Sequence, residues 1–535
     1  MFRRGFIVRF WEIFPGTLTW ITLIGAPVLA FFHPVWISVY VIIFDCYWFF
    51  KGANIAIHLL WSYRLLKLHQ KVDWLSVLQK CMTKEQMIEY FQKILLESNP
   101  SLKKLCTLEL ERLSDLSRPI IDWQRIYHVI LVPTVKESLE VLSESIDSYA
   151  QASYPREKMF FILATEERAG ENTRITAKKL QDKYQDKFGK FFWIEHPDGL
   201  PGEIVGKGAN VTYAASAVKG KLVELQIPFE DVIISTFDAD TVVEKSYFSH
   251  LTYDFLTEQK PLQRSYQPIP MYHNNIWDTP AIARVIAISS SFWQMVEASR
   301  PDRLITFSSH AMSYKTLVDV GFWRKDIVPE DSHIFWQCFL HFNGDYKTKP
   351  LFSTVSMDAV LGDNYWGTMV AQYKQKRRWA WGVTEMSLVF PQLFANKKIP
   401  LWKRFIYSER LVEGHYFWAT ASIMIAILGW LPLIFGGNRF GDTVLAVNLP
   451  QLTKWIMSTA TFFLIFSIYI NIVQLPPRPK GHSKIKNFFM VIQWVFSPIV
   501  STVFGSMPAI DAQTRLLFGK YMGFWVTPKV RKQNN

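Results

Sequence analysis

The stretch DVIISTFDAD, residues 231–240, decides the fold, because a short apolar run ends here in two carboxylates. Three similar runs precede it, at 128–132, 159–163 and 190–194, and longer stretches with helical spacing separate them. Short apolar runs that alternate with helical patterns are typical of strands in a mostly parallel α/β sheet. Ligands of such sheets bind beyond the carboxyl ends of the strands, so the residues that follow each run are the first candidates for a site.

The composition excludes several classes of protein. Of 535 residues, 59 are Lys or Arg and 46 are Asp or Glu, which gives a net charge of +13. Charged residues make up 20% of the chain and aromatic residues 16%, which excludes a disordered chain, a collagen and a coiled coil, and argues against a purely soluble enzyme. The four cysteines have neither tight pairing nor metal-ligand spacing, so we expect no disulfide framework and no zinc ribbon.

Apolar runs near both ends predict membrane-spanning helices. The candidates are 16–32 and 34–50 near the N-terminus, and 416–435, 455–475 and 488–510 near the C-terminus. Basic residues flank the first pair, so the positive-inside rule places both flanks in the cytoplasm. The tail after 510 is also basic, so we expect 488–510 to dip into the membrane and return. Asp45 lies inside the second run and is either a functional intramembrane carboxylate or a residue that reaches the headgroups or a helix partner.

These patterns divide the chain into six parts. We expect an N-terminal transmembrane pair (1–64), a helical cytoplasmic segment without an assigned role (65–124), the α/β domain (125–390), an interfacial helix (391–410), a C-terminal transmembrane region (411–510) and a cytoplasmic tail (511–535).

Two acidic motifs are candidates for chemistry. Asp238 and Asp240 follow the fourth strand, and two carboxylates at a strand end can share Mg²⁺ or Mn²⁺, although a lone D-x-D is more often a solvated turn. Glu330 and Asp331 precede an apolar helix, where a carboxylate suits general-base work on a hydroxyl; the alternative is an ordinary helix N-cap.

Two basic motifs accompany them. Lys207 lies in the small-residue turn GKGAN at 206–210. Gln375, Arg378 and Trp379 form Q-x-x-R-W, in which the arginine can bind phosphate and the tryptophan can stack on a ring. The alternative for the second motif is a juxtamembrane basic patch that meets anionic lipid.

Taken in this order, the motifs resemble those of membrane-embedded family 2 glycosyltransferases, in the branch that includes the cellulose and hyaluronan synthases. The resemblance covers about 125–385 and the flanking membrane layout. It implies a GT-A-like catalytic domain, related to the Rossmann fold with a mixed sheet, inserted between N- and C-terminal transmembrane helices.

The resemblance also implies a role for each motif residue. Asp331 matches the catalytic base, with Glu330 as its supporting residue, and Asp238 and Asp240 match the pair that binds the metal. Glu137, Glu166, Lys207 and Asp238 match donor or nucleotide contacts, and Gln375, Arg378 and Trp379 match the motif for the pyrophosphate and the acceptor sugar. The segment FWVTPK at 524–529 looks like one at the cytoplasmic mouth of the active site in synthases of this branch.

The chain departs from the family pattern at three places. Lys136 stands where the family usually has Asn. The second strand is followed by ATEER (164–168) instead of an acidic pair, so Glu166 would reach the base from two positions further on; uridine remains the default nucleotide. Ser308-Ser-His310 replaces a glycine-rich acceptor loop, and His310 either touches the acceptor or is a structural histidine.

The resemblance thus implies an inverting, metal-dependent hexosyltransferase. It would move a sugar from a nucleotide-sugar donor, by default a UDP-sugar, to a polysaccharide acceptor at the cytoplasmic face of a prokaryotic inner membrane, with coupled export. The alternative acceptor is a polyprenyl phosphate or another lipid, and a transporter or scaffold without activity is the weakest hypothesis. We expect no nucleic-acid partner, since the basic charge concentrates beside the membrane runs.

Overall fold

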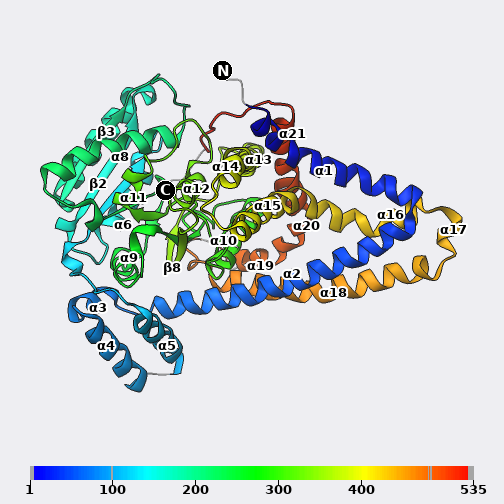
Figure 1. The fold of residues 1–535 in the computed structure, drawn as a ribbon, viewed down its shortest axis with the longest axis horizontal. Coiled ribbons are helices and arrows are strands. Elements are labelled where there is room, and N and C mark those ends of the chain that lie inside the picture. The colour runs from blue at the N-terminus through cyan, green and yellow to red at the C-terminus, as the bar shows by residue number, and fades with distance from the viewer. Residues whose placement is uncertain (1–4, 98–99, 480, 482, 484, 528–535) are drawn as a thin grey trace. The chain divides into compact units, whose positions relative to one another are not determined.

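The computed structural model describes residues 5–97, 100–479, 481, 483 and 485–527. The chain forms two compact units, which we describe separately. The sheet unit comprises Trp61–Asn274 and Trp293–Asp358, and the helical unit comprises Met1–Leu60, Asn275–Phe292 and Ala359–Asn535. Figure 1 shows the fold.

One mixed sheet organises the sheet unit, and its strand order is β3-β2-β1-β4-β7-β6-β8-β5. The contiguous strands β3, β2, β1 and β4 are parallel, while β7 is antiparallel to both β4 and β6. Strand β8 pairs parallel with β6 and antiparallel with β5. In chain order the strands are β1 (Tyr127–Pro133), β2 (Met159–Glu166), β3 (Lys190–His196), β4 (Val232–Thr236), β5 (Val242–Val243), β6 (Arg264–Met271), β7 (Ala311–Ser313) and β8 (Lys347–Ser356).

The predicted α/β domain between N- and C-terminal helices is confirmed. Its first four strands fall where the apolar runs predict them. Two of them, β2 and β4, are buried along their whole length. Burial of such runs is the main driving force for this half of the fold. The sheet-unit helices are α3 (Trp74–Lys80), α4 (Lys84–Glu97), α5 (Pro100–Asp115), α6 (Leu139–Ala150), α7 (Glu171–Tyr184), α8 (Lys207–Glu224), α9 (Tyr247–Leu256), α11 (Tyr314–Asp319) and α12 (Glu330–His341).

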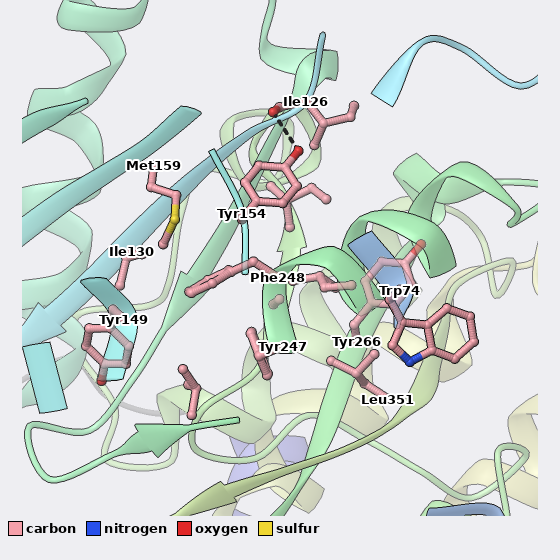
Figure 2. Packing of buried hydrophobic residues seen from close by; sticks show 14 of the residues in the cluster. Trp74, Ile126, Ile130, Tyr149, Tyr154, Met159, Tyr247, Phe248, Tyr266 and Leu351 are labelled. Carbon is pink, nitrogen blue, oxygen red and sulfur yellow. Dashed lines mark hydrogen bonds between the residues drawn. The ribbon is translucent and has the colours of Figure 1, made fainter. Parts of the chain in front are cut away.

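An aromatic-rich core joins the sheet to its helices (Figure 2). Tyr149 stacks on Phe237 with ring centroids 5.2 Å apart, and the Tyr154 hydroxyl donates to the Ile126 carbonyl at 3.0 Å. Trp74 of α3 belongs to the same cluster, so the segment 65–124, whose role the sequence left open, shares its core with the sheet. This shared core fixes β1 and β4, whose carboxyl ends carry the candidate site.

Ion pairs bind α5 to α9 as well. Arg112 contacts Glu109 at 2.5 Å and Asp254 at 2.6 Å, and both carboxylates are buried. Burial alone would raise the pKa of Asp254, but Lys349 and Arg112 hold this pKa well below its ordinary value. The helical segment is therefore tied to the sheet unit by charge as well as by apolar packing.

The helical unit contains the apolar helices. Among the described residues, five helical stretches are long and apolar enough to span a membrane: Phe6–Phe32, Pro34–His69, Leu401–Phe435, Val444–Val473 and Ile485–Leu517. Its helices are α1 (Phe6–Phe32), α13 (Tyr365–Ala380), α14 (Glu385–Ala395), α15 (Leu401–Ile427), α16 (Leu431–Phe435), α17 (Gly437–Gly441), α18 (Val444–Val473), α19 (Ile485–Ile492), α20 (Ser497–Ser501) and α21 (Met507–Leu517), while α2 (Pro34–His69) and α10 (Ala281–Ala298) each run from one unit into the other.

The last of these stretches is not a uniform helix. Between α19 and α21 it passes through a 3₁₀ turn, the short α20 and a π-helical turn at Thr502–Ser506. The Ser506 hydroxyl in this turn donates to the Trp418 carbonyl of α15 at 3.1 Å. The predicted interfacial stretch 391–410 falls on the end of α14, a turn and the first part of α15.

Candidate active site

Three motif residues that are far apart in the sequence meet at the carboxyl ends of the strands. Lys207 is the first residue of α8, Asp238 follows β4, and Asp331 is the second residue of α12. The Lys207 ammonium donates to Asp238 Oδ1 at 2.8 Å and to both Asp331 carboxylate oxygens at 3.0 Å. One cation therefore bridges the two carboxylates; we call these three residues the lysine clamp.

The lysine clamp lies where the order of the sheet reverses. The two neighbours of β1 are β2 and β4, so the chain leaves β1 toward one side of the sheet and later returns on the other side. Ligands of open α/β sheets bind at this switch point. Burial alone would lower the pKa of Lys207, but the carboxylates of Asp238, Asp331 and Glu330 outweigh that effect and raise this pKa above its ordinary value. Lys207 is therefore charged at neutral pH.

A glycine explains why GKGAN and the Glu330–Asp331 pair meet. A Cβ atom on Gly208 would lie 2.6 Å from the Arg324 carbonyl oxygen and 3.1 Å from Glu330 Cβ. Only glycine lets α8 approach α12 this closely. The Asn210 side chain then donates to the Ala164 carbonyl of β2 at 3.1 Å and fixes the helix to the sheet.

Asp240 is held more deeply than Asp238. It is buried, and its Oδ2 accepts a hydrogen bond from the Asp358 backbone N–H at 2.9 Å. Asn274 donates to the Asp240 carbonyl and to Asp358 Oδ1, both at 2.9 Å. Asp240 is thus oriented by the residues that follow β6 and β8.

The predicted divalent cation fits this donor set only together with a ligand. Asp238 and Asp240 offer hard carboxylate oxygens, which suit Mg²⁺ or Mn²⁺. Within the described ranges there is no group of three or more His, Cys, Asp or Glu side chains that could hold a metal ion. The remaining ligands would have to be water and phosphate oxygens, as is usual for Mg²⁺ at nucleotide sites.

The two glutamates predicted to contact the nucleotide have different surroundings. Glu137 Oε2 accepts hydrogen bonds from the Thr134 hydroxyl at 2.8 Å and from the backbone N–H groups of Val135 and Lys136 at 2.8 and 3.1 Å. It therefore orders the turn that follows β1. Glu166 ends β2, is buried and pairs with Arg168.

The loop before β7 adds contacts that the motifs did not indicate. The Ser308 hydroxyl donates to Asp238 Oδ2 at 2.7 Å. His310 is buried, and its Nδ1 lies 2.8 Å from the Phe307 carbonyl. Burial lowers the pKa of His310, although Asp331 opposes the shift. Ser308 is the functional candidate of this loop that sequence reasoning missed, and the departure at 308–310 was its only signal.

The Q-x-x-R-W motif lies in the helical unit, on α13. The Arg378 guanidinium carbon is 4.9 Å from the centroid of the Phe524 ring, and Lys376 Nζ is 4.4 Å from that of Trp379. Arg377, by contrast, pairs with Asp511 at 2.8 Å. The motif thus presents Arg378 beside an aromatic residue of the tail.

The remaining predicted features are Gln375 and the tail segment FWVTPK. Gln375 lies on the same helix, α13. Of the segment FWVTPK, residues 524–527 are described, while 528 and 529 lie outside the described residues.

Residues 233–479 match the family described as Glycosyl transferase family group 2, a range that includes both acidic motifs and Q-x-x-R-W. This region of the chain therefore matches family 2 glycosyltransferases, which supports glycosyltransferase activity. A sequence search of curated proteins finds no match to the chain.

The solved structures to which the chain is similar include a mannosyltransferase and TarS. The mannosyltransferase PcManGT from Pyrobaculum calidifontis, in complex with GDP-Man and Mn²⁺, is 14% identical, and the match covers 78% of this chain and 98% of that one with a TM-score of 0.38. Residues 1–349 of TarS from S. aureus, in complex with UDP-GlcNAc, are 10% identical, with 74% and 93% covered and a TM-score of 0.32.

Proposed function

We propose that this glycosyltransferase transfers a hexose from a nucleotide-sugar donor to an acceptor hydroxyl, with inversion at the sugar carbon. The observation that carries the proposal is the lysine clamp. A candidate base, Asp331, and a candidate donor ligand, Asp238, share one partly buried ammonium at the switch point of the sheet. Residues with a purely structural role have no need to gather two carboxylates and a cation there.

The proposed chemistry uses Asp331 as the general base. The acceptor oxygen attacks the anomeric carbon of the sugar, the bond from that carbon to the diphosphate breaks, and the hydroxyl proton passes to Asp331. The diphosphate leaves as an anion, so no protein acid is required. Lys207 holds a positive charge against both carboxylate oxygens of Asp331, and Glu330 supports the start of α12.

A divalent cation belongs to this proposal. Asp240 and Asp238 would hold Mg²⁺ or Mn²⁺ together with the donor phosphates, and the ion would supply charge neutralisation for the leaving diphosphate. Asp240 is pre-oriented for this by the Asp358 N–H. By the resemblance, Glu137 and Glu166 serve the nucleotide, and Gln375, Arg378 and Trp379 serve the pyrophosphate and the acceptor sugar.

The acceptor is proposed from the resemblance to the synthase branch. We take it to be a polysaccharide that is extended at the cytoplasmic membrane face and exported, with a UDP-sugar as the default donor. Five candidate spans are a modest number for an export path, and this favours the alternative acceptor, a polyprenyl phosphate or another lipid. A prokaryotic inner membrane is the location that the same resemblance implies.

The test is nucleoside-diphosphate release by the full chain in detergent. UDP- and GDP-sugars are supplied with Mn²⁺ or Mg²⁺ and a membrane-lipid extract, and the product is sized. Release with one donor supports the proposal, and a polymer ladder or a single added sugar decides between the two acceptors. If neither release nor nucleotide binding occurs with any donor, the chain is a transporter or a scaffold and the proposal is wrong.

A further inference from the structure

A small pocket lies beside the lysine clamp, at the carboxyl ends of β2 and β3. Its volume is about 70 Å³, which suits the edge of a ring rather than a whole nucleotide. A larger hollow of about 470 Å³ lies on α4 and α5, but none of the predicted site residues lines it. The small pocket is lined by Glu166, Arg168, His196, Asp198, Gly199, Leu200, Glu203, Ile204, Val205, Gly206 and Ala209.

The pocket is joined to the lysine clamp by α8. Gly206 and Ala209 line the pocket, while Lys207 between them donates to Asp238 and Asp331. A nucleotide whose base edge enters the pocket would therefore place its phosphates at the first turn of α8. The N-terminus of a helix favours phosphate, since its backbone N–H groups and dipole present positive charge. The pocket thus lies where a donor base belongs if the proposed function holds.

One side of the pocket is polar and consists of the Glu166 carboxylate and the Arg168 guanidinium beside it. Arg168 Nε donates to Glu166 Oε2, and the Glu166 side chain is only 7% exposed. Among the described residues, none forms a hydrogen bond with Glu166 Oε1 or with the two terminal nitrogens of Arg168. The pair therefore presents a donor from Arg168 followed by the two acceptor oxygens of Glu166.

Glu203, one of the three carboxylate residues that line the pocket, is already paired. Glu203 Oε2 lies 2.8 Å from His196 Nε2, and Glu203 Oε1 lies 3.0 Å from Lys325 Nζ. This double pairing fixes the loop that closes the pocket and leaves Glu166 and Asp198 as the lining carboxylates that can read a ligand. Of these two, Glu166 is the one held beside a guanidinium, that of Arg168.

A row of one donor and two acceptors distinguishes the common bases. Guanine presents the complementary row along one edge: the O6 acceptor, the N1–H donor and the N2 amino donor. Uracil presents acceptor, donor, acceptor, so its O2 carbonyl would face a Glu166 oxygen and repel it. Cytosine presents a donor and two acceptors, and adenine has only a C–H where the second donor is needed.

We infer that this pocket reads a guanine base, so that the donor is a GDP-sugar and not the UDP-sugar that the family resemblance makes the default. The inference rests on the proposed function, because it names the nucleotide of the same site. Glu166 accepts from guanine N1–H and the N2 amino group, and Arg168 donates to O6.

The test is equilibrium binding of four nucleotides to the detergent-purified full chain with Mn²⁺. GDP, UDP, ADP and inosine diphosphate are titrated, since inosine diphosphate keeps O6 and N1–H but lacks the 2-amino group. We expect GDP to bind about tenfold more tightly than UDP or ADP, and inosine diphosphate to fall between GDP and UDP. Glu166→Gln should remove most of the preference, whereas Glu171→Gln, an exposed glutamate of α7 outside the pocket, should retain it.

The binding results separate the guanine assignment from the proposed function. UDP binding as tightly as GDP, or more tightly, overturns the guanine assignment and leaves the proposed function intact. Equal binding of GDP and inosine diphosphate removes Glu166 as the reader of the 2-amino group. Binding of no diphosphate overturns the proposed donor site itself. The wild-type panel alone settles the preference if Glu166→Gln fails to fold.

Discussion

The most informative perturbation of the lysine clamp is Lys207→Met, which keeps the length of the side chain and removes its charge. Lys207 makes three charged hydrogen bonds, and its side chain is 10% exposed, whereas those of Asp238 and Asp331 are 30% and 24% exposed. Removing one partner of a fully buried ion pair costs about 3–5 kcal/mol. Because water still reaches both carboxylates, we expect a loss of about 2 kcal/mol here.

The assay is a double-mutant cycle on the thermal unfolding of the full chain in detergent. For a chain of 535 residues a loss of about 2 kcal/mol lowers the midpoint by about 2 °C. Asp331→Asn alone should cost less, since Lys207 keeps Asp238. The double variant should be more stable than the sum of the two single effects predicts, by about 1 kcal/mol.

Lys219→Met is the matched control for this cycle. Lys219 lies on the same helix, α8, and is exposed, so its replacement should leave the midpoint within about 0.5 °C. Strict additivity of Lys207→Met and Asp331→Asn would mean that the ammonium does not stabilise the Asp331 carboxylate.

Three further predictions concern the cation, acid stability and the tail. Asp240→Asn should weaken Mn²⁺-dependent nucleotide binding about tenfold or more; an unchanged metal dependence would remove Asp240 from the site. Burial lowers the pKa of His128 to about 3, whereas the unfolded value is about 6.5, so the unfolded chain alone binds this proton between the two values. The stability that His128 contributes is therefore full above pH 6.5 and falls toward pH 3, by up to about 1.4 kcal/mol per pH unit. His128→Gln should flatten the pH dependence of the unfolding midpoint between these values. An unchanged dependence of the midpoint on pH contradicts this. Tyr521 donates to buried Glu12 of α1 at 2.8 Å, so Tyr521→Phe should speed hydrogen exchange across 519–527, and equal exchange in both proteins would show that the contact does not hold the tail.

The sequence predicts one half of the sheet well and misses the other half. Strands β1 to β4 are continuous apolar runs, and such runs have few alternatives to burial. Strand β6, in contrast, reads RSYQPIPM, and the two prolines argue against a central strand, although all eight residues are buried. Its place depends on pairing with β7 and β8, about 40 and 80 residues further on, and no local pattern encodes those contacts.

The sequence likewise predicts some residues of the candidate site and misses others. The motifs indicated Lys207, Asp238 and Asp331, and the structure brings these three side chains together. They did not indicate that Ser308 donates to Asp238 or that the Asp358 backbone N–H orients Asp240. Such contacts depend on where the backbone passes, so residue type and spacing alone do not reveal them. For Glu137, the motif indicated a nucleotide contact, whereas the structure shows its Oε2 accepting hydrogen bonds within the turn that follows β1.

The central claim is that Asp331 removes the acceptor proton at a donor site held together by Lys207. The most direct measurement is turnover and donor binding side by side, for the wild type and Asp331→Asn, with the donor that supports nucleoside-diphosphate release. We expect Asp331→Asn to bind the donor within about threefold of the wild type and to lose turnover by about 100-fold or more. Near-normal turnover in Asp331→Asn would contradict the claim.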